Sequence, residues 1–299
     1  MSATPIIFDR ALLRRRRDRA APGLHRVAPV LEDAAERLLD RLDDTTRRFS
    51  RALDLGGRGV IAPRLRDRGI GTVVSMDLSP ATAALSGGMA VAGDEEWLPF
   101  AAGSFDLVVA NLSLHWVNDL PGALIQIRHA LAPDGLFLAS LPALGTLQSL
   151  REALAASEAE LRGGVSPRVS PFPEVSDGAA LLQRAGFALP VADAEVMHLS
   201  YRTPLALLRD LQAAGESNAV AARDIRPPPR ALLPAALARL TGEDGTVAAT
   251  LRLLTLTGWA PSPDQPKAAR PGSATARLAD ALGAAEQGTG EVTPFRRRH

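Results

Sequence analysis

Short apolar runs recur along the first half of the chain, and helix-like stretches separate most of them. The runs are continuous rather than alternating, which is typical of strands that are covered on both faces. Alternation of such strands with helices predicts a parallel, doubly wound α/β sheet with right-handed crossovers. Five strands are expected in this half, at residues 52–55, 72–77, 89–92, 105–111 and 135–141.

Capping residues mark where the helices between these strands begin. Ser79-Pro80 places a capping hydroxyl and then proline directly after the strand that ends at Asp77. Asn118-Asp119, followed by Pro121, opens a second helix, and Pro133-Asp134-Gly135 is expected to close it with a turn. These signals put the predicted helices on the connections between strands, as a doubly wound sheet requires.

Helical periodicity continues on both sides of this region. Apolar residues at three- and four-residue spacing from Val30 to about Asp43 predict a helix with one buried stripe. Two late strands separated by helices are expected to complete the same sheet rather than form a new domain. The later elements are helices near 147–161, 178–184, 205–213 and 229–240, a loop at 163–173, and strands near 192–199 and 250–257.

By pattern alone the chain divides into three parts. Residues 1–45 are expected to form a basic arm and a helix, and residues 46–260 to form the α/β domain. Residues 261–299 are dominated by Pro, Ala, Gly and Ser, which predicts a mobile tail.

The composition supports a globular chain and excludes several kinds of site. Of 299 residues, 46% are hydrophobic and 22% charged, as expected of a soluble folded protein. The absence of cysteine excludes a disulfide framework, a zinc–thiolate site, an iron–sulfur cluster and a cysteine nucleophile. No window approaches the roughly 18 uninterrupted apolar residues of a membrane span. Because the N-terminal arginine run also lacks the apolar segment of a signal peptide, a cytoplasmic protein is expected.

The formal net charge of +1 is a sum of opposed local patches. Lys+Arg total 34 against 33 for Asp+Glu, which excludes nucleic-acid binding through a strongly basic net charge. Seven arginines lie between Arg10 and Arg26. This arm suits nucleic acid, an anionic lipid headgroup or an acidic partner surface, or it is a basic helix that folds over a cofactor pocket. Phe8 is its only aromatic residue, which does not favour a platform that stacks nucleic-acid bases, and we expect no nucleic-acid partner. Without an apolar span, we expect at most peripheral membrane contact.

The strongest chemical signal lies where successive strands end. The glycines of Leu53-Asp54-Leu55-Gly56-Gly57-Arg58-Gly59 follow the first strand and allow backbone N–H groups to approach a ligand. Asp77 ends the second strand about 20 residues later, where an acidic side chain accepts ribose hydroxyls. Asp94 follows the third strand, where a carboxylate can face an adenine amino group, and Asn111 ends the fourth.

Each of these residues also has a simpler structural explanation. The glycines could serve a tight turn, Asp77 could lie next to a helix cap, and Asp94 could be a turn residue. Their order after successive strands nevertheless predicts a nucleoside-bearing cofactor in a Rossmann-like crevice. The candidate cofactor-binding residues are Asp54, Gly56, Gly57, Gly59, Asp77, Leu78, Asp94, Glu95 and Asn111.

This ordered set resembles the class I S-adenosylmethionine-dependent methyltransferases. Asp54-Leu55-Gly56-Gly57-Arg58-Gly59 is similar to their glycine-rich first motif, Asp77 to their ribose acid, and residues 93–100 to their adenine loop. The usual pattern is Asp-Leu-Gly-x-Gly-x-Gly, and one residue is missing here between Gly56 and Gly57, so a tighter loop is expected. The resemblance implies a seven-stranded Rossmann-like class I methyltransferase fold, with an N-terminal helical arm and helical insertions. It also implies S-adenosyl-L-methionine as cofactor.

Longer motifs occur in loops over nearly the whole chain. They are residues 7–10, 112–121, 164–172, 210–218, 258–259 and 270–275. Together they resemble the assembly factor 5 family of respiratory complex I, which keeps the methyltransferase fold and is assigned as a protein-arginine hydroxylase. The resemblance implies a complex I iron–sulfur subunit, near the quinone site, as partner and substrate. Lys267 is the only lysine and no convincing transit peptide is present, which indicates a bacterial-type member.

Candidate catalytic and substrate-binding residues lie in the same crevice. His115 is suited to deprotonate an acceptor, with Trp116 beside it, unless both residues only shape the pocket wall. Glu216 and Asn218 carry the oxygen acceptors that bind a guanidinium, unless they belong to a helix-ending turn. None of the five histidines stands in a His-x-Asp or His-x-Glu motif, so no metal site is predicted. Hydroxylation therefore rests on the resemblance alone.

The leading functional hypothesis is an S-adenosylmethionine-binding enzyme of complex I assembly that hydroxylates an arginine of the iron–sulfur subunit or of another protein substrate. The first alternative is a conventional methyltransferase acting on a small molecule or a carrier-bound acid. The second is an assembly chaperone that binds the cofactor without turnover. The arginine-rich flanks favour a protein substrate, whereas a deep apolar lid would favour a small one.

Overall fold

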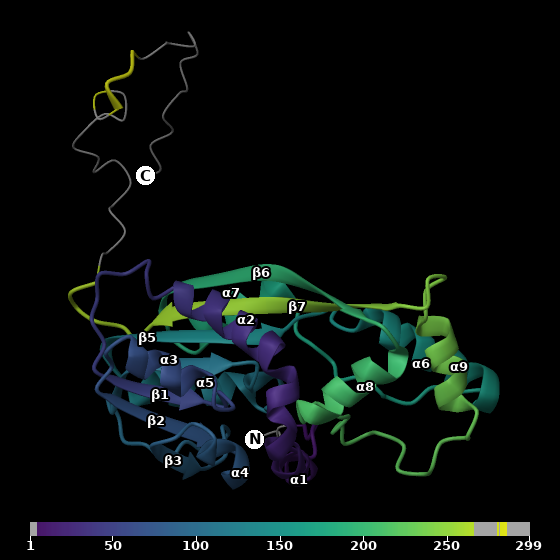
Figure 1. The fold of residues 1–299 in the computed structure, drawn as a ribbon. Helices are drawn as coiled ribbons and strands as arrows, with labels where there is room; N and C mark the ends of the chain where they lie inside the picture. Colours follow the sequence, from purple (N-terminus) through teal and green to yellow (C-terminus); the bar gives the residue numbers. More distant parts are fainter. Residues whose placement is uncertain (1–4, 266–279, 281, 286–299) are drawn as a thin grey trace, which may run out of the picture. The chain divides into compact units, whose positions relative to one another are not determined.

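Seven strands form one sheet in the order β3-β2-β1-β4-β5-β7-β6 (Figure 1). β1 to β5 are parallel to one another, and β7 runs antiparallel to both of its neighbours, β5 and β6. The doubly wound sheet is therefore confirmed, and the two late strands complete it as expected. The strands are β1 Arg51–Leu55, β2 Thr72–Asp77, β3 Met89–Ala92, β4 Phe105–Asn111, β5 Leu131–Pro142, β6 Ala188–Tyr201 and β7 Val247–Trp259.

The computed structural model describes residues 5–265, 280 and 282–285. The chain divides into two units, Met1–Ser262 and Pro263–His299, and the whole sheet belongs to the first. Most of the predicted tail at 261–299 lies outside the described residues. No helix in the described ranges combines the length and the apolarity needed to cross a bilayer.

Helices cover both faces of the sheet and begin where their caps predict. Ser79 accepts a hydrogen bond from the backbone N–H of Thr82 at 3.1 Å, and Asp119 accepts one from Gly122 at 2.9 Å. The helices are α1 Arg10–Ala20, the 3₁₀ turn η1 Ala21–Val27, α2 Ala28–Asp40, α3 Ile61–Asp67, α4 Pro80–Ala84, the 3₁₀ turn η2 Leu114–Trp116, α5 Leu120–Ala130, α6 Gln148–Arg162, α7 Val175–Arg184, α8 Pro204–Ala213 and α9 Leu232–Leu240.

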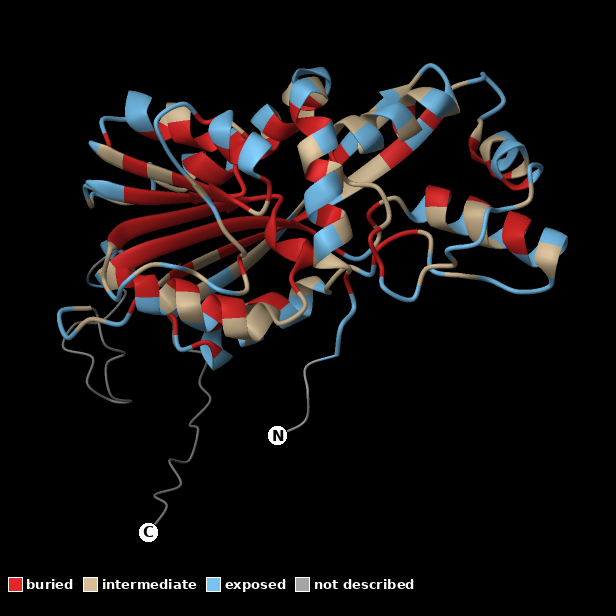
Figure 2. Cartoon of the chain, turned by 90° about the horizontal axis from the view of Figure 1, so that it is seen from below, coloured by how far each residue is buried: buried red, intermediate tan, exposed pale blue. Residues whose placement is uncertain are grey.

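The core lies on the two faces of the central strands. Every residue of β4 is buried, and in β1 only Arg51 is exposed, so continuous apolar runs there correspond to strands covered on both faces. One apolar cluster includes side chains of α5 and α7, and the other includes side chains of α2 and α3. Figure 2 shows the central strands as the most continuously buried part of the described chain.

Two local predictions are wrong. β3 is an edge strand that pairs only with β2 and is largely exposed, so it is not covered on both faces. The Pro133-Asp134-Gly135 segment does not separate helix from strand, because α5 passes directly into β5 at Leu131. It forms an irregularity inside β5 instead, with Asp134 at φ 60°, where the pairing with β4 shifts register.

The helical insertions build a smaller core at one end of the sheet. α6, α8 and α9 lie together there, next to the long strands β6 and β7 (Figure 1). Their buried side chains include Leu150, Leu207 and Ala236. The 163–173 loop is held to α6 by Glu158, which accepts hydrogen bonds from Ser166 and Arg168. This second layer provides walls for a cavity beside the carboxyl ends of the parallel strands.

The N-terminal arm is fastened to this edge by backbone pairing. Asp9 N–H donates to Ala219 at 2.8 Å, and Ala221 N–H donates to Ile7 at 2.7 Å. The side-chain oxygen of Asn118 accepts from the N–H groups of both Ile7 and Phe8 at 2.8 Å. α1 is thereby held over the ends of the strands, which agrees with the alternative that the basic arm covers a pocket.

Asn118→Ala is expected to loosen the arm while the sheet stays folded. Loss of its hydrogen bonds removes about 1–3 kcal/mol of local stability, so amides of residues 8–20 should exchange faster with deuterium. Gln148→Ala, which removes an exposed amide from α6, is the control and should leave that exchange unchanged. Equal protection of the arm in both variants would contradict the role given to Asn118.

Candidate functional site

The glycine loop after β1 is packed tightly against its own scaffold. Gly56 has φ 70°, and a Cβ there would lie 2.4 Å from the Cβ of Ser113. A Cβ on Gly57 would lie 1.9 Å from a carboxylate oxygen of Asp54. Gly59 has φ 81° and approaches Leu85. The glycines are therefore required by the packing of the loop itself, in keeping with the tightness expected from the missing residue.

Asp54 holds this loop to β2 rather than facing a ligand in the described structure. Its carboxylate is fully buried and accepts hydrogen bonds from Ser75 Oγ at 3.1 Å and from the N–H of Ala62 at 3.2 Å. Burial raises the pKa of Asp54 to about 7, because these hydrogen bonds only partly replace the lost hydration. Asp54 is a scaffold residue of the site.

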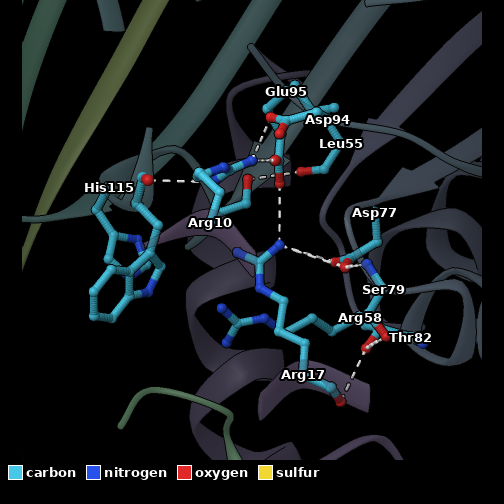
Figure 3. A network of polar contacts seen from close by, with 12 residues as sticks. Arg10, Arg17, Leu55, Arg58, Asp77, Ser79, Thr82, Asp94, Glu95 and His115 are labelled. Atoms are coloured by element: carbon cyan, nitrogen blue, oxygen red, sulfur yellow. Dashed lines mark hydrogen bonds and ion pairs between the residues drawn. The ribbon is translucent and has the colours of Figure 1, made fainter. Parts of the chain in front are cut away.

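Asp77 and Glu95 are engaged by a buried arginine from α1 (Figure 3). Arg17 Nη1 lies 3.4 Å from both carboxylate oxygens of Asp77 and 3.0 Å from Glu95 Oε1. The Arg17 side chain is 2% exposed, and its Nε and Nη2 make no hydrogen bond within the described part of the chain. Asp77 also accepts from the N–H of Ser79 at 2.7 Å. The acid expected to bind ribose is thus paired with an arginine of the chain itself.

A second arginine of α1, Arg10, forms ion pairs with the acids of the predicted adenine loop, Asp94 and Glu95. Arg10 Nη2 donates to Asp94 at 2.6 Å and also to Glu95. Burial alone raises the pKa of Glu95, but the charges of Arg17 and Arg10 outweigh it and lower that pKa. Leu78 packs beneath the same helix, against the cluster of Phe8 and Leu13. α1 therefore neutralises the carboxylates that the sequence assigns to the nucleoside.

A cavity of about 510 Å³ opens beside the glycine loop. Its walls come from α2, η2, α6, α8 and β6, and most are aliphatic or aromatic. The polar side chains that line it include Arg58, His115, Arg168, Tyr201, Asp210 and Glu216. An apolar cavity with few polar groups next to a topological switch point is the usual form of a small-molecule or side-chain site.

Glu216 is the hub of the wall nearest the glycine loop. Its Oε2 accepts from Trp116 Nε1 at 2.7 Å and lies 2.9 Å from His115 Nε2, and its Oε1 accepts from Arg58. Burial opposes ionisation, but His115 and Arg58 hold the pKa of Glu216 far below its ordinary value. Glu216 was predicted to bind the guanidinium of a substrate. In the structure its carboxylate already binds the guanidinium of Arg58.

Burial favours the neutral form of the His115 side chain. Burial lowers its pKa against the charge of Glu216. With Nε2–H donated to the carboxylate, Nδ1 carries the lone pair, and it has no hydrogen-bond partner among the described residues. Trp116 packs edge-on against Phe8, with ring centroids 5.2 Å apart. The geometry permits both readings of His115, as a base through Nδ1 and as part of the wall.

Two other candidates make structural contacts. Asn111 donates to the carbonyl of Leu31 at 3.1 Å and accepts from Ser140 Oγ at 2.8 Å, so it ties β4 to α2 and β5. Asn218 donates to the carbonyl of Pro167 at 2.8 Å and accepts from the N–H of Val220 at 3.0 Å, as a turn residue does. Asn218 lines the cavity whereas Asn111 does not, and the side-chain amides of both residues are engaged by the protein.

The sequence did not indicate that Arg58 belongs to the site, nor that Arg10 and Arg17 pair with its acids. Arg58 lies between two glycines of the loop, has φ 52°, and turns its side chain toward the carbonyl of Leu112 at 3.0 Å. An arginine inside a cofactor loop is a visible signal, but its target is distant in sequence. In the described ranges, no group of three or more His, Asp or Glu side chains is placed to hold a metal ion.

Residues 53–139 match the family described as a methyltransferase domain. The YcgJ protein from Bacillus subtilis matches at 15% identity with a TM-score of 0.52, over 75% of this chain and 98% of that one. The [4+2]-cyclase SpnF matches at 16% identity with a TM-score of 0.51, over 87% and 99%. These likenesses establish the Rossmann-like class I methyltransferase fold and leave the reaction open.

Curated relatives are far more similar in sequence. The arginine-hydroxylase NDUFAF5 of Danio rerio is 38% identical over 285 residues, which cover 92% of this chain and 89% of that protein. The human protein of the same name is 40% identical over 280 residues, covering 90% and 81%. The chain belongs to the NDUFAF5 family. The malonyl-[acyl-carrier protein] O-methyltransferase of Halorhodospira halophila is 34% identical over 271 residues, covering 84% and 88%. The chain is therefore similar over most of its length both to the NDUFAF5 proteins and to an O-methyltransferase.

The raised pKa of Asp54 predicts a pH dependence of stability. A folded-state pKa of about 7 against 3.8 means that this group stabilises the fold at low pH and that its contribution, at most about 4 kcal/mol, is lost as pH rises toward 7. Asp54→Asn keeps an oxygen acceptor and removes the titration. Urea unfolding at pH 5 and pH 8 should therefore show the variant gaining stability relative to the wild type at the higher pH. The same pH dependence in both proteins would contradict the assignment.

Proposed function

We propose that this chain is an S-adenosylmethionine-binding enzyme that hydroxylates an arginine side chain of a protein, the iron–sulfur subunit of respiratory complex I, during assembly. Membership of the family whose relatives are named arginine-hydroxylase supports the reaction. The structural observation that carries the proposal is the cavity beside the glycine loop, whose apolar walls hold two carboxylates, Asp210 and Glu216. Apolar walls suit the methylenes of an arginine, and carboxylates suit its guanidinium.

The described residues fit the cofactor once α1 releases them. Asp77 ends β2, where it can accept both ribose hydroxyls, and Asp94 and Glu95 follow β3, where they can face the adenine. Gly56, Gly57 and Gly59 bring the backbone of the loop close to the same edge. When bound, S-adenosylmethionine would supply a sulfonium-activated methyl group, which is the chemistry of methyl transfer. Hydroxylation of an arginine instead inserts an oxygen atom into a C–H bond and needs molecular oxygen and a two-electron reductant as co-substrates. The chain's own carboxylates supply the contacts that would select the nucleoside.

Within the cavity, Asp210 is the carboxylate best suited to a substrate guanidinium. Both oxygens of Glu216 are engaged by Arg58, His115 and Trp116, whereas no arginine or lysine of the described chain forms an ion pair with Asp210. Its partner is the hydroxyl of Tyr201, whose pKa is raised to about 12 by burial and then by the Asp210 charge. A carboxylate that lines an apolar cavity without a cation favours a cationic ligand.

His115 and Glu216 would position the reacting end of the substrate. The carboxylate fixes the imidazole through Nε2, which leaves the lone pair of the buried Nδ1 to accept a proton from a substrate group that reaches it. Arg58, held by Glu216 and Leu112, closes the cavity toward the glycine loop and keeps that wall rigid. Asn218 supports this wall through its contact with Pro167.

Peptide mass spectrometry of the complex I iron–sulfur subunit tests the reaction directly. In cells that contain this protein we expect an arginine carrying an added oxygen atom, and in deletion cells the unmodified peptide. A methyl adduct in place of the oxygen would support methyl transfer. Loss of complex assembly with no change in modification would leave the chaperone hypothesis.

Asp210→Asn should lower the modified fraction of that peptide without unfolding the protein. Loss of a charge-assisted hydrogen bond corresponds to roughly a tenfold to hundredfold lower kcat/KM. Glu36→Gln removes one exposed carboxylate from α2 and is the matched control, with no expected effect. Full modification by the Asp210 variant would show that the guanidinium binds elsewhere.

Methylation of a carrier-bound acid is a second candidate. The relative from Halorhodospira halophila carries that name, and the leucine-rich lining of the cavity suits an acyl chain. Incubation of the purified protein with S-adenosylmethionine and a malonyl carrier protein distinguishes the two. We expect no methyl ester above the level of a boiled control, and a catalytic yield of ester would move the assignment to this second candidate.

A further inference from the structure

α1 inserts two guanidinium groups into the place where a nucleoside is expected. Arg17 pairs with Asp77 and Glu95, and Arg10 pairs with Asp94 and Glu95. Figure 3 shows both side chains pointing from the helix toward these acids. Every carboxylate that the fold offers to the ribose and adenine is therefore matched with an internal cation.

Arg17 and a ribose diol cannot occupy Asp77 together. Arg17 Nη1 is equidistant, at 3.4 Å, from both carboxylate oxygens, and the N–H of Ser79 takes a further position on Oδ1. With Arg17 in this position only 3% of the Asp77 side chain is exposed, so no open face of the carboxylate is left for the two hydroxyls of a ribose. The nucleoside site and this position of Arg17 therefore exclude each other.

The pairing is electrostatically strong but incompletely hydrogen-bonded. Arg17 Nε and Nη2 are buried and make no hydrogen bond in the described part of the chain, and the contacts to Asp77 are long. An unmade hydrogen bond on a buried cation costs free energy. That cost makes this arrangement easier to displace than a fully satisfied ion pair.

The same helix also contacts the segment that carries Glu216. Arg16 Nη1 donates to the carbonyl of Ser217 at 2.6 Å, and Gly215 packs against Arg17 and Ala20. The arm that precedes α1 pairs with residues 219–221. A movement of α1 would therefore be transmitted to the cavity wall.

We propose that α1 is a latch, closed by Arg10 and Arg17 on the cofactor carboxylates, that S-adenosylmethionine opens as it binds. Opening also releases residues 215–221, so cofactor binding precedes and prepares the substrate cavity. The latch rests on the proposed cofactor. It predicts that Arg17 competes with the nucleoside instead of assisting it.

Calorimetric titration with S-adenosylhomocysteine, a stable probe of the nucleoside site, tests the competition. Arg17→Gln should bind roughly tenfold or more tightly than the wild type, because the buried acids lose their internal counterion. Arg14→Gln removes an exposed arginine of the same helix and should bind like the wild type. Circular dichroism establishes that each variant is folded.

Deuterium exchange of the wild-type protein provides a readout that does not depend on a variant. Addition of S-adenosylhomocysteine should speed exchange in residues 10–20 and 215–221 and slow it in the glycine loop. Increased protection of α1, or equal or weaker binding by Arg17→Gln, would overturn the latch while the cofactor assignment stands. Absence of binding to both wild type and variant would overturn the cofactor assignment and the latch with it.

Discussion

The site depends on the neutralisation of buried carboxylates by arginines of the same chain. Asp77 and Glu95 are almost fully buried at the ends of β2 and β3, and ions in such places are stable only with a partner. α1 provides that partner in Arg17, and Arg10 adds a second charge at Glu95. Together with the backbone pairing of the arm and the contact of Arg16 with Ser217, this network holds α1 against the ends of β2 and β3 and against the 215–221 segment.

Glu216 repeats the same principle at the cavity wall. Its carboxylate accepts hydrogen bonds from Arg58 of the glycine loop and from His115 and Trp116 of η2. The glycine loop therefore contributes Arg58 to the wall of the cavity. Under the proposed function, this one loop would serve both the cofactor and the substrate side chain.

The fold could be predicted from sequence because its determinants are local. Buried parallel strands read as continuous apolar runs, and Ser79 and Asp119 marked helix starts that the structure confirms. β3 was misjudged because an apolar run does not reveal whether a strand lies at the edge of its sheet. The turn at Pro133–Gly135 was misjudged because a turn signal and a strand irregularity use the same residues.

The site was predicted less completely, for a physical reason. Position after a strand indicated that Asp77, Asp94 and Glu95 share one edge, and the structure brings them together there. Their partners Arg10 and Arg17 lie 60 or more residues away along the chain. Periodicity shows only which face of a helix is polar. The sequence also does not reveal where the side chain of Asn111 points. Its amide hydrogen-bonds to Leu31 and Ser140 instead of facing the crevice.

A crystal structure of the protein with S-adenosylhomocysteine would show whether the nucleoside displaces Arg17. We expect ribose hydroxyls on the Asp77 carboxylate, with the Arg17 guanidinium moved away from it and the 215–221 segment displaced. A nucleoside bound in the crevice while Arg17 keeps its contacts with Asp77 and Glu95 would contradict this expectation.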